Sequence, residues 1–384
     1  MNLSLLLARA QQAKRQSGKS ILTQLLEIAR LRKAYGQIGP SEYFDYGLFD
    51  EKKHNEDSRK EFVGWSTESL INDQFNKVEW AALSLDKIMF YTFLEGAGIP
   101  YPKVQAIFST SGRFLRETPT FTTSKSLADY LKSQAVYPIF VKPSHGNFGR
   151  GSYFLSHYDE ASDSIVFHDG TQSTALKFTD SLETKLSGGY IFQNVFPPHP
   201  SLVEICGPRS CTLRIVVVVD KQGPHLLRAV WKIPTGQNVI DNFKHGRTGN
   251  LVASVNVKNG EVKRVIGSGE NGEFVEVATH PDTGKPVSPI TISGWPVIED
   301  LCLRSARLIP GYRLLHFDIA LAESGPALLE VNYRGNMDLL QHASGKGFLT
   351  HELTKALEDQ KVLRKEIAEI VQQTLREQQG NTGA

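Results

Sequence analysis

Apolar residues recur at helical spacing over the first 35 positions and again between residues 80 and 96. In the first stretch, leucines and alanines lie three or four positions apart, with Lys and Arg between them. This spacing gathers the apolar side chains on one face of a helix. The second stretch ends at Gly96-Ala97-Gly98-Ile99-Pro100, a helix stop. Residues 50–60 are polar, and we expect them to form an exposed loop.

From residue 137 onward, short apolar runs separated by turn residues predict strands. The runs span residues 137–141, 153–155, 164–167, 190–195, 212–219, 226–233, 251–257, 261–266, 273–278, 312–321 and 327–332. Residues 296–308 have the pattern of an amphipathic helix. Residues 352–377 combine helical spacing with many charges, which is typical of a surface helix.

The helices and strands together predict an α+β protein with three parts. Pro197-Pro198-His199-Pro200 can continue neither a strand nor a helix, and therefore predicts a boundary. We expect an N-terminal helical region at 1–78, a first subdomain at 79–195 and a second subdomain at 196–384. A chain of 384 residues is long enough for two or three such units.

Composition excludes several classes of protein. With 43 basic and 41 acidic residues the net charge is +2, so the basic excess of a nucleic-acid-binding protein is missing. No apolar run approaches the roughly 20 residues of a membrane span. The three cysteines, Cys206, Cys211 and Cys302, are too few for a disulfide framework or a zinc site. We therefore expect reduced thiols and a cytoplasmic protein.

The strongest local motif joins a strand to a glycine-rich loop. Lys142 ends an apolar strand and is followed by Gly146, Gly149 and Gly151. A lysine at the end of a buried strand is costly unless it meets an anion. The glycines let backbone N–H groups approach that anion. The motif suits a lid over nucleotide phosphates, with His145 binding phosphate, although a plain hairpin with solvated side chains is the alternative.

A second motif gathers oxygen donors on a predicted hairpin. Glu330 and Asn332 are two positions apart, so they point to one face of a strand. A three-residue loop at 324–326 would place Asp318 opposite Asn332 and on the face of Glu330; a two-residue loop would reverse Asp318 unless a bulge intervenes. Three such donors suit Mg²⁺. The alternative is a polar side that faces water.

Arg214 lies within the apolar run at 213–219. An unpaired arginine buried there would be costly, so an anionic partner is expected. Phosphate and a structural carboxylate are both suitable partners.

Taken together and in this order, these motifs resemble the ATP-grasp superfamily over residues 80–349. Asp86-Lys87 is similar to the opening element whose lysine touches the nucleotide. Residues 190–195 resemble the strand that grips adenine through its backbone, with Asn194 where many relatives carry Glu. Residues 212–215 are similar to the strand whose arginine meets phosphate or acyl phosphate. Asp318 and the segment 329–332 resemble the metal-binding strands.

Four further segments are similar to one branch, the sugar-transfer-associated ATP-grasp proteins. They span residues 42–46, 241–243, 280–284 and 339–341. We expect 42–46 to pack in the core and 280–284 to stabilise a turn, while 241–243 suits a turn or a site equally. The resemblance implies two α+β subdomains that sandwich ATP, with an N-terminal helical extension and a C-terminal surface helix.

The activity implied by the resemblance is ATP-dependent carboxylate–amine ligation through an acyl phosphate, in surface-polysaccharide or secondary metabolism. Mg²⁺ is the implied metal, with Mn²⁺ as an alternative. A kinase of the same fold and a non-catalytic nucleotide-binding scaffold are the rival hypotheses. The sequence leaves open the acid, the amine, a homodimer and the role of residues 1–75.

The resemblance also assigns residues to roles. The catalytic set is Arg214, Lys142 and Asn332. The nucleotide-binding set is Lys87, Lys142, His145, Gly146, Gly149, Gly151, Gln193, Asn194, Val195, His199, Lys232 and Asn242. The metal-binding set is Asp318, Glu330 and Asn332.

Overall fold

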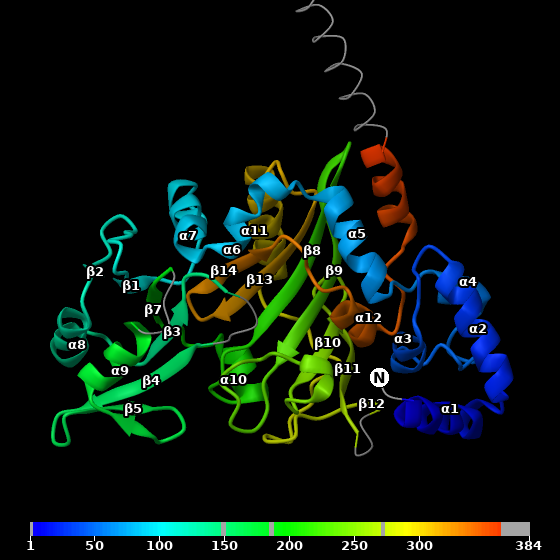
Figure 1. Ribbon diagram of the computed structural model, residues 1–384, viewed down its shortest axis with the longest axis horizontal. Coiled ribbons are helices and arrows are strands. Elements are labelled where there is room, and N and C mark those ends of the chain that lie inside the picture. Colours follow the sequence, from blue (N-terminus) through cyan, green and yellow to red (C-terminus); the bar gives the residue numbers. More distant parts are fainter. Residues whose placement is uncertain (1–2, 147–150, 184–187, 270–272, 362–384) are drawn as a thin grey trace, which may run out of the picture.

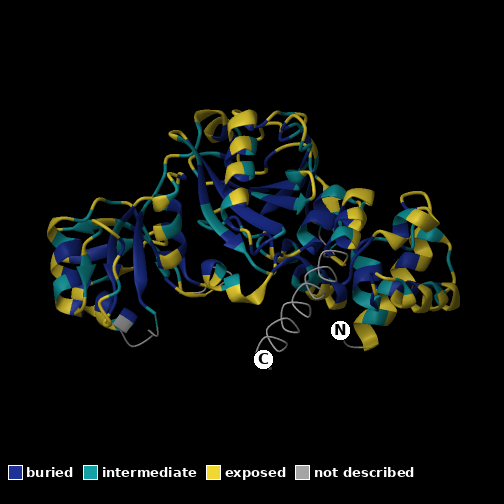
Figure 2. Ribbon diagram, turned by 90° about the horizontal axis from the view of Figure 1, so that it is seen from above, coloured by how far each residue is buried: buried dark blue, intermediate teal, exposed yellow. Residues whose placement is uncertain are grey.

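The computed structural model describes residues 3–146, 151–183, 188–269 and 273–361. Two seven-stranded sheets lie side by side, and the N-terminal helices are gathered at the far end of the larger sheet (Figure 1). The expected α+β architecture with two sheets is therefore confirmed. In Figure 2 the central strands are buried, whereas the helices at both ends of the molecule have exposed outer faces. No helix within the described ranges is long and apolar enough to cross a membrane.

The smaller sheet has the strand order β2-β1-β7-β3-β4-β5-β6 and is antiparallel except for the pair β1–β2. Helices α8 (Ser124–Ser133) and α9 (Ala175–Glu183) pack on it, and Leu127, Leu131 and Phe178 are buried in the shared core. Its strands are β1 (Val104–Phe108), β2 (Thr120–Phe121), β3 (Ile139–Pro143), β4 (Tyr153–Asp159), β5 (Ser164–Phe167), β6 (Gln172–Ser173) and β7 (Tyr190–Asn194).

The larger sheet is antiparallel throughout, in the order β12-β11-β10-β9-β8-β13-β14. One face packs against α11 (Trp295–Leu308) and α7 (Lys87–Gly96), with Ile215, Trp231 and Phe317 at the centre of that core. Its strands are β8 (Thr212–Asp220), β9 (Gly223–Ile233), β10 (Leu251–Val255), β11 (Val262–Ser268), β12 (Phe274–Glu276), β13 (Leu314–Ala322) and β14 (Gly325–Asn332).

The second face of the larger sheet changes character along the strands. Val216 and Val218 of β8 lie in an apolar core with α5 (Trp65–Phe75), α12 (Asp338–Ser344) and residues 351–361. Arg214, two residues before Val216, lies on the same face because side chains alternate along a strand. The same strands therefore give this face an apolar end and a charged end.

The N-terminal region forms a small helical unit beside α12. It comprises α1 (Leu3–Ser17), α2 (Ile21–Lys33), α3 (Pro40–Asp45) and α4 (Glu56–Lys60). Tyr43 is fully buried, as expected for packing. Residues 50–60 are mostly exposed, as expected, but residues 56–60 form α4 instead of a loop. His54 and Arg59 are buried, and Arg59 pairs with Glu27 at 3.2 Å.

The expected single helix at 80–96 is interrupted. The chain forms η1 (Val78–Trp80), α6 (Ala82–Leu85) and then α7. Asp86 lies between α6 and α7 with extended backbone, φ −120° and ψ 106°, and its carboxylate accepts hydrogen bonds from the N–H groups of Ile88 and Met89. Asp86 thus stops one helix and caps the next.

The hairpin β13–β14, which the sequence predicts to bind a metal, has a different strand-pairing register from the expected one. Ala322 pairs with Gly325, so the turn contains two residues instead of three. A bulge at Leu329 then restores the shared face, and Asp318 lies opposite Glu330 and not opposite Asn332. One extra residue in one strand shifts the side-chain alternation by one position. The two carboxylates are therefore direct cross-strand neighbours.

The remaining elements are α10 (Pro200–Cys206) and η2 (Lys244–Gly246). The expected boundary at 197–200 is followed at once by a helix, because Pro200 occupies the first helical position, where its missing N–H costs nothing. The expected surface helix is described over residues 351–361, and the rest of it lies outside the described residues. Its inner side is buried at Leu353, Ala356 and Leu357.

Candidate active site

A cleft of about 400 Å³ lies between the two sheets. It is lined from one side by β3, β4 and the end of β7, and from the other by β8, β9, β13 and β14. The cleft brings together thirteen of the residues that the sequence assigns. They are Lys87, Lys142, His145, Gly146, Gln193, Asn194, Val195, Arg214, Lys232, Asn242, Asp318, Glu330 and Asn332.

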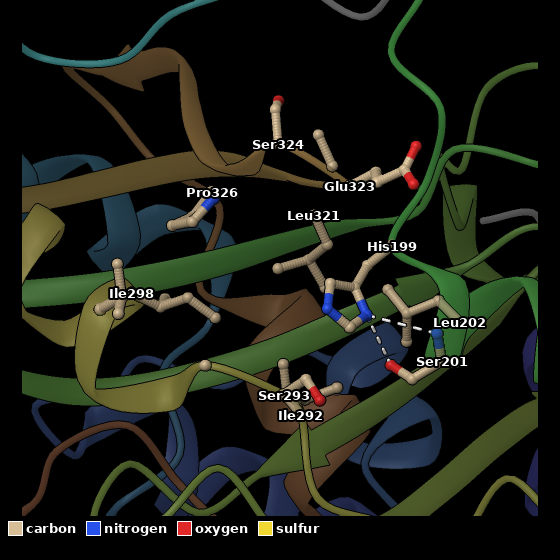
Figure 3. Close-up of a pocket in the computed structure, with 14 residues that line it drawn as sticks. His199, Ser201, Leu202, Ile292, Ser293, Ile298, Leu321, Glu323, Ser324 and Pro326 are labelled. Carbon is tan, nitrogen blue, oxygen red and sulfur yellow. Dashed lines mark hydrogen bonds between the residues drawn. The ribbon is translucent and has the colours of Figure 1, made fainter.

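Two assigned residues lie elsewhere, and Gly149 falls outside the described residues. Gly151 has a φ of +73°, which favours glycine, but does not line the cleft. His199 lines a separate cavity of about 270 Å³ beside the β13–β14 turn (Figure 3). Its Nδ1 lies 2.8 Å from the Ser201 hydroxyl, at the start of α10.

Two lysines, Lys87 and Lys142, line the cleft near the start of the glycine loop. Lys142 Nζ donates to the Tyr91 hydroxyl at 3.1 Å, and Lys87 Nζ donates to the carbonyl of Gly146 at 2.9 Å. Burial lowers the pKa of Lys142 to about 8. Burial, and then the charge of Lys142, lowers the pKa of Lys87 to about 8. Neither lysine is in an ion pair with a described residue, so both cations can meet an anion in the cleft.

Arg214 has a carboxylate partner in this structure. Its Nε and Nη2 atoms donate to the two oxygens of Asp318 at 2.5 and 2.7 Å. Lys232 Nζ lies 3.6 Å from Asp318 and 3.4 Å from Asp241. Burial opposes the ionisation of Asp318, but the charges of Arg214 and Lys232 outweigh it and hold the pKa of Asp318 well below its usual range. The charged end of the sheet is thus a network in which positively and negatively charged side chains alternate.

Glu330 is in the opposite electrostatic situation. Burial, and then the neighbouring carboxylate of Asp318, raises the pKa of Glu330 above its usual value. Asp318 and Glu330 are direct cross-strand neighbours, so their like charges oppose each other. Asn332 lies beside this pair, with its Nδ2 3.4 Å from Glu330. Two adjacent carboxylates and an amide oxygen are donors that suit Mg²⁺, which would offset that repulsion.

The opposite end of the cleft suits an aromatic base. Its walls include the apolar side chains of Phe140, Phe154 and Leu329. The Oδ1 atom of Asn194 is buried and has no hydrogen-bond partner among the described residues. A buried acceptor without a partner is costly, and the amino group of a base would satisfy it. The residues at this end therefore fit an adenine.

Asp86 connects the start of α7 to the base of the glycine loop. Its Oδ2 accepts from Arg113 Nη2 at 2.5 Å and lies 3.1 Å from Nε2 of His145. Lys87 follows directly, and its N–H donates to the carbonyl of Ser144 at 2.9 Å. The same short segment therefore fixes both the lysine and the loop.

Sequence motifs give no signal for Glu68 of α5, which also lines the cleft. Glu68 accepts a hydrogen bond from the N–H of Met337 at 2.7 Å, and burial raises its pKa to about 7. Asp241, Arg334 and Asn336 complete this wall. The sequence suits Asp241 equally to a turn or to a site. In the structure it lines the cleft and accepts a hydrogen bond from the Thr212 hydroxyl at 2.5 Å. The N-terminal region thus contributes to the cleft.

The segment 280–284 stabilises a turn, as expected. His280 is fully buried with Nε2 3.0 Å from the carbonyl of Pro234, and Asp282 pairs with Arg209 at 2.6 Å. Neither residue lines the cleft. The cysteines Cys206, Cys211 and Cys302 are free and buried.

Comparison with known proteins gives one family and several distant structures. The sugar-transfer associated ATP-grasp family matches residues 67–358. No curated protein matches the chain. The ATP-grasp ligase PsnB complexed with a minimal precursor is 16% identical, with a TM-score of 0.40, over 74% of this chain and 64% of that one. Biotin carboxylase from Campylobacter jejuni is 12% identical, with a TM-score of 0.45, over 78% and 54%. N5-carboxyaminoimidazole ribonucleotide synthetase from Thermotoga maritima is 12% identical, with a TM-score of 0.39, over 78% and 56%.

This chain spans less than two thirds of the length of each of these three structures. The family match spans residues 67–358, more than half of this chain, and these residues include every cleft residue from Glu68 to Asn336. On that match, the chain belongs to the sugar-transfer-associated ATP-grasp family.

Proposed function

We propose that the protein is an ATP-dependent ligase that joins the carboxylate of one small molecule to the amine of another. The observation that carries this proposal is the charge arrangement of the cleft. Four cations line the cleft together with the neighbouring carboxylates of Asp318 and Glu330. They are Lys87 of α7, Lys142 of β3, Arg214 of β8 and Lys232 of β9. An arrangement of this kind suits a polyphosphate and its metal.

The two lysines of the first subdomain are proposed to hold the phosphates. Burying Lys87 and Lys142 lowers their pKa values to about 8, and an anion between them would offset that cost. Gln193, Asn194 and Val195 would hold the base at the apolar end of the cleft. The glycine loop, anchored by Asp86 through His145, would exclude water from the reacting groups.

Asp318, Glu330 and Asn332 are the residues that would hold Mg²⁺. When bound, the metal would draw charge from the phosphates and make the γ-phosphoryl group easier to transfer. Glu330 and Asn332 are its most available donors, because Arg214 and Lys232 already engage Asp318. Arg214 therefore acts in two ways in this proposal: it orients Asp318, and its charge stabilises the anion that develops during transfer.

The proposed reaction has two steps. The substrate carboxylate takes the γ-phosphoryl group of ATP, which releases ADP and leaves an acyl phosphate. The amine then attacks the acyl carbon and phosphate leaves, which gives an amide. No protein nucleophile is required.

Nucleotide release with defined pairs of substrates tests the proposal. The protein is incubated with MgATP and a panel of acids and amines, and ADP is quantified by chromatography. We expect ADP to form only when one acid and one amine are both present. ADP formation that never depends on an acid–amine pair would contradict ligation, and a phosphorylated product without an amine requirement would identify a kinase.

A matched pair of variants links turnover to the cleft. Lys142→Met removes a buried cation at the phosphates and is expected to abolish turnover. Lys132→Met removes a partly exposed lysine that pairs with Asp163 at 2.7 Å, away from the cleft, and is expected to leave turnover unchanged. Equal activity of the two variants would count against the proposed phosphate site.

A further inference from the structure

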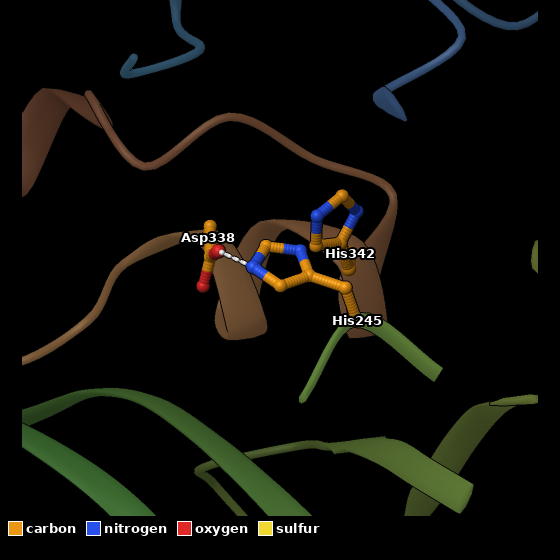
Figure 4. A group of neighbouring side chains, drawn as sticks. All are labelled: His245, Asp338 and His342. Carbon is orange, nitrogen blue, oxygen red and sulfur yellow. Dashed lines mark ion pairs between the residues drawn. The ribbon is translucent and has the colours of Figure 1, made fainter. Parts of the chain in front are cut away.

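A second group of metal-ligating side chains lies outside the cleft. His245, Asp338 and His342 each offer one ligand atom, and these atoms all lie within 4.8 Å of one another (Figure 4). His245 comes from η2, whereas Asp338 and His342 lie one turn apart on α12. Residues four positions apart face the same side of a helix. Two separate segments therefore bring their ligands to one point.

The backbone of η2 is unusual at the residues that deliver His245. Lys244 and His245 both have positive φ, at 45° and 55°, although neither is glycine. Such conformations are uncommon for residues with a Cβ atom. Here they aim the imidazole at α12, and its Nε2 lies 3.2 Å from Oδ2 of Asp338.

His342 is the least satisfied member of the group. Its side chain is 6% exposed, and its ring makes no hydrogen bond to any other residue that the structure describes. The rings of Tyr46 and Phe274 pack against it, with centroids 4.8 and 4.6 Å away. A buried imidazole with an unused nitrogen that points into a carboxylate and a second imidazole is a ready metal ligand.

Asp338 is held by its surroundings in the orientation that a ligand needs. It is 4% exposed, and its Oδ2 lies 3.2 Å from Nε2 of His245. Arg264, which donates to the carbonyl of His342, pairs with Glu276 at 2.8 Å. A carboxylate oriented by a second group is typical of metal sites in proteins.

We propose that His245, Asp338 and His342 form a binding site for a transition-metal dication of the Zn²⁺ class. Two imidazoles and one carboxylate are donors that Zn²⁺ prefers and Mg²⁺ does not. Metal–ligand bonds of about 2.0–2.2 Å place the ligand atoms at most about 4 Å apart. The ligand atoms here lie within 4.8 Å of one another, so rotation of the side chains would bring them to that distance. Three protein ligands leave the fourth position open.

The proposed site is independent of the proposed ligation, but it lies next to the cleft. Asn242 and Asn336 line the cleft, and they precede His245 and Asp338 by three and two residues. A metal at this site would link the two segments that carry Asn242 and Asn336.

Metal titration of the full chain tests the site. The protein is freed of metal with a chelator and titrated with Zn²⁺ by calorimetry and with Co²⁺ by visible absorption. We expect one equivalent of Zn²⁺ to bind with micromolar affinity or tighter, and Co²⁺ to give d–d bands of nitrogen and oxygen ligation. Glu330→Gln is expected to leave this binding unchanged, which separates the site from the Mg²⁺ site.

Variants decide which residues bind. His245→Ala and His342→Ala are each expected to weaken Zn²⁺ binding by about 100-fold or more, because two ligands rarely hold Zn²⁺ alone. The matched control is His225→Ala, since His225 is a similarly exposed histidine 3.9 Å from Asp220. Unchanged affinity in His245→Ala, a variant on an outer loop that does not disturb the core, would overturn the proposal. Absence of stoichiometric binding by the wild-type chain would also overturn it.

Discussion

The two neighbouring carboxylates of the cleft should respond to neutralisation in opposite ways. Asp318 accepts two hydrogen bonds from Arg214, whose side chain is only 13% exposed. Asp318→Asn leaves Arg214 and Lys232 buried with one partner fewer. Removing one member of a buried ion pair typically costs about 3–5 kcal/mol, so we expect the free energy of unfolding to fall by about that amount.

Glu330→Gln should leave the free energy of unfolding unchanged or raise it. Burial and the charge of Asp318 raise the pKa of Glu330, so its ionisation disfavours the folded state. That cost is absent below the ordinary pKa of a glutamate and grows as the pH rises through it. The advantage of the Gln variant over the wild type should therefore increase with pH.

Urea unfolding followed by circular dichroism, without and with Mg²⁺, measures both effects. A ligand at ten times its dissociation constant stabilises the folded state by about 1.4 kcal/mol. We expect Mg²⁺ to stabilise the wild type and not the Glu330→Gln variant. If Glu330→Gln loses as much stability as Asp318→Asn, or if Mg²⁺ stabilises it as much as the wild type, Glu330 is a structural residue and the metal assignment is refuted.

Three further predictions concern the lysines, the loop anchor and the C-terminal helix. Nucleotide affinity should fall as the pH rises through about 8, because Lys87 and Lys142 lose their protons there, and Lys142→Arg should weaken that pH dependence in calorimetric titrations; a wild-type affinity independent of pH would contradict this. Asp86→Ala should lower the free energy of unfolding by about 1 kcal/mol, because a helix cap is lost, and should also weaken nucleotide binding. Thr123→Ala removes the cap of α8 far from the cleft and should lower only thermal stability. If both variants change nucleotide affinity equally, Asp86 does not anchor the loop. Leu353→Ala should cost about 2–5 kcal/mol in urea unfolding, because Leu353 is fully buried, and a loss below about 0.5 kcal/mol would show that residues 351–361 do not pack in solution.

The predictable part of the fold is the part in which local pattern and burial agree. The apolar run at 212–219 predicts a strand, and the structure has β8 there. Every predicted strand from 137 onward is present, with ends shifted by a few residues. Shorter or less apolar elements such as β2 and β6, two residues each, give no periodic signal because two positions cannot establish a period.

Register and partners could not be predicted from the sequence. Asp318 meets Glu330 instead of Asn332 because the turn has two residues and Leu329 is bulged, and nothing in an apolar strand marks the position of a bulge. The partner of Arg214 lies 104 positions away on a strand that the chain reaches only after four intervening strands and the helix α11. Glu68 reaches the cleft because α5 packs on the second face of the larger sheet, which is a tertiary contact.

The central claim is ligation through an acyl phosphate, and oxygen transfer tests it most directly. An acid that supports ADP formation is labelled with ¹⁸O in its carboxylate, and the phosphate released during amide formation is analysed by mass spectrometry. The account predicts one labelled oxygen in each phosphate, because that oxygen bridges carbon and phosphorus in the acyl phosphate. Unlabelled phosphate released together with amide would contradict it.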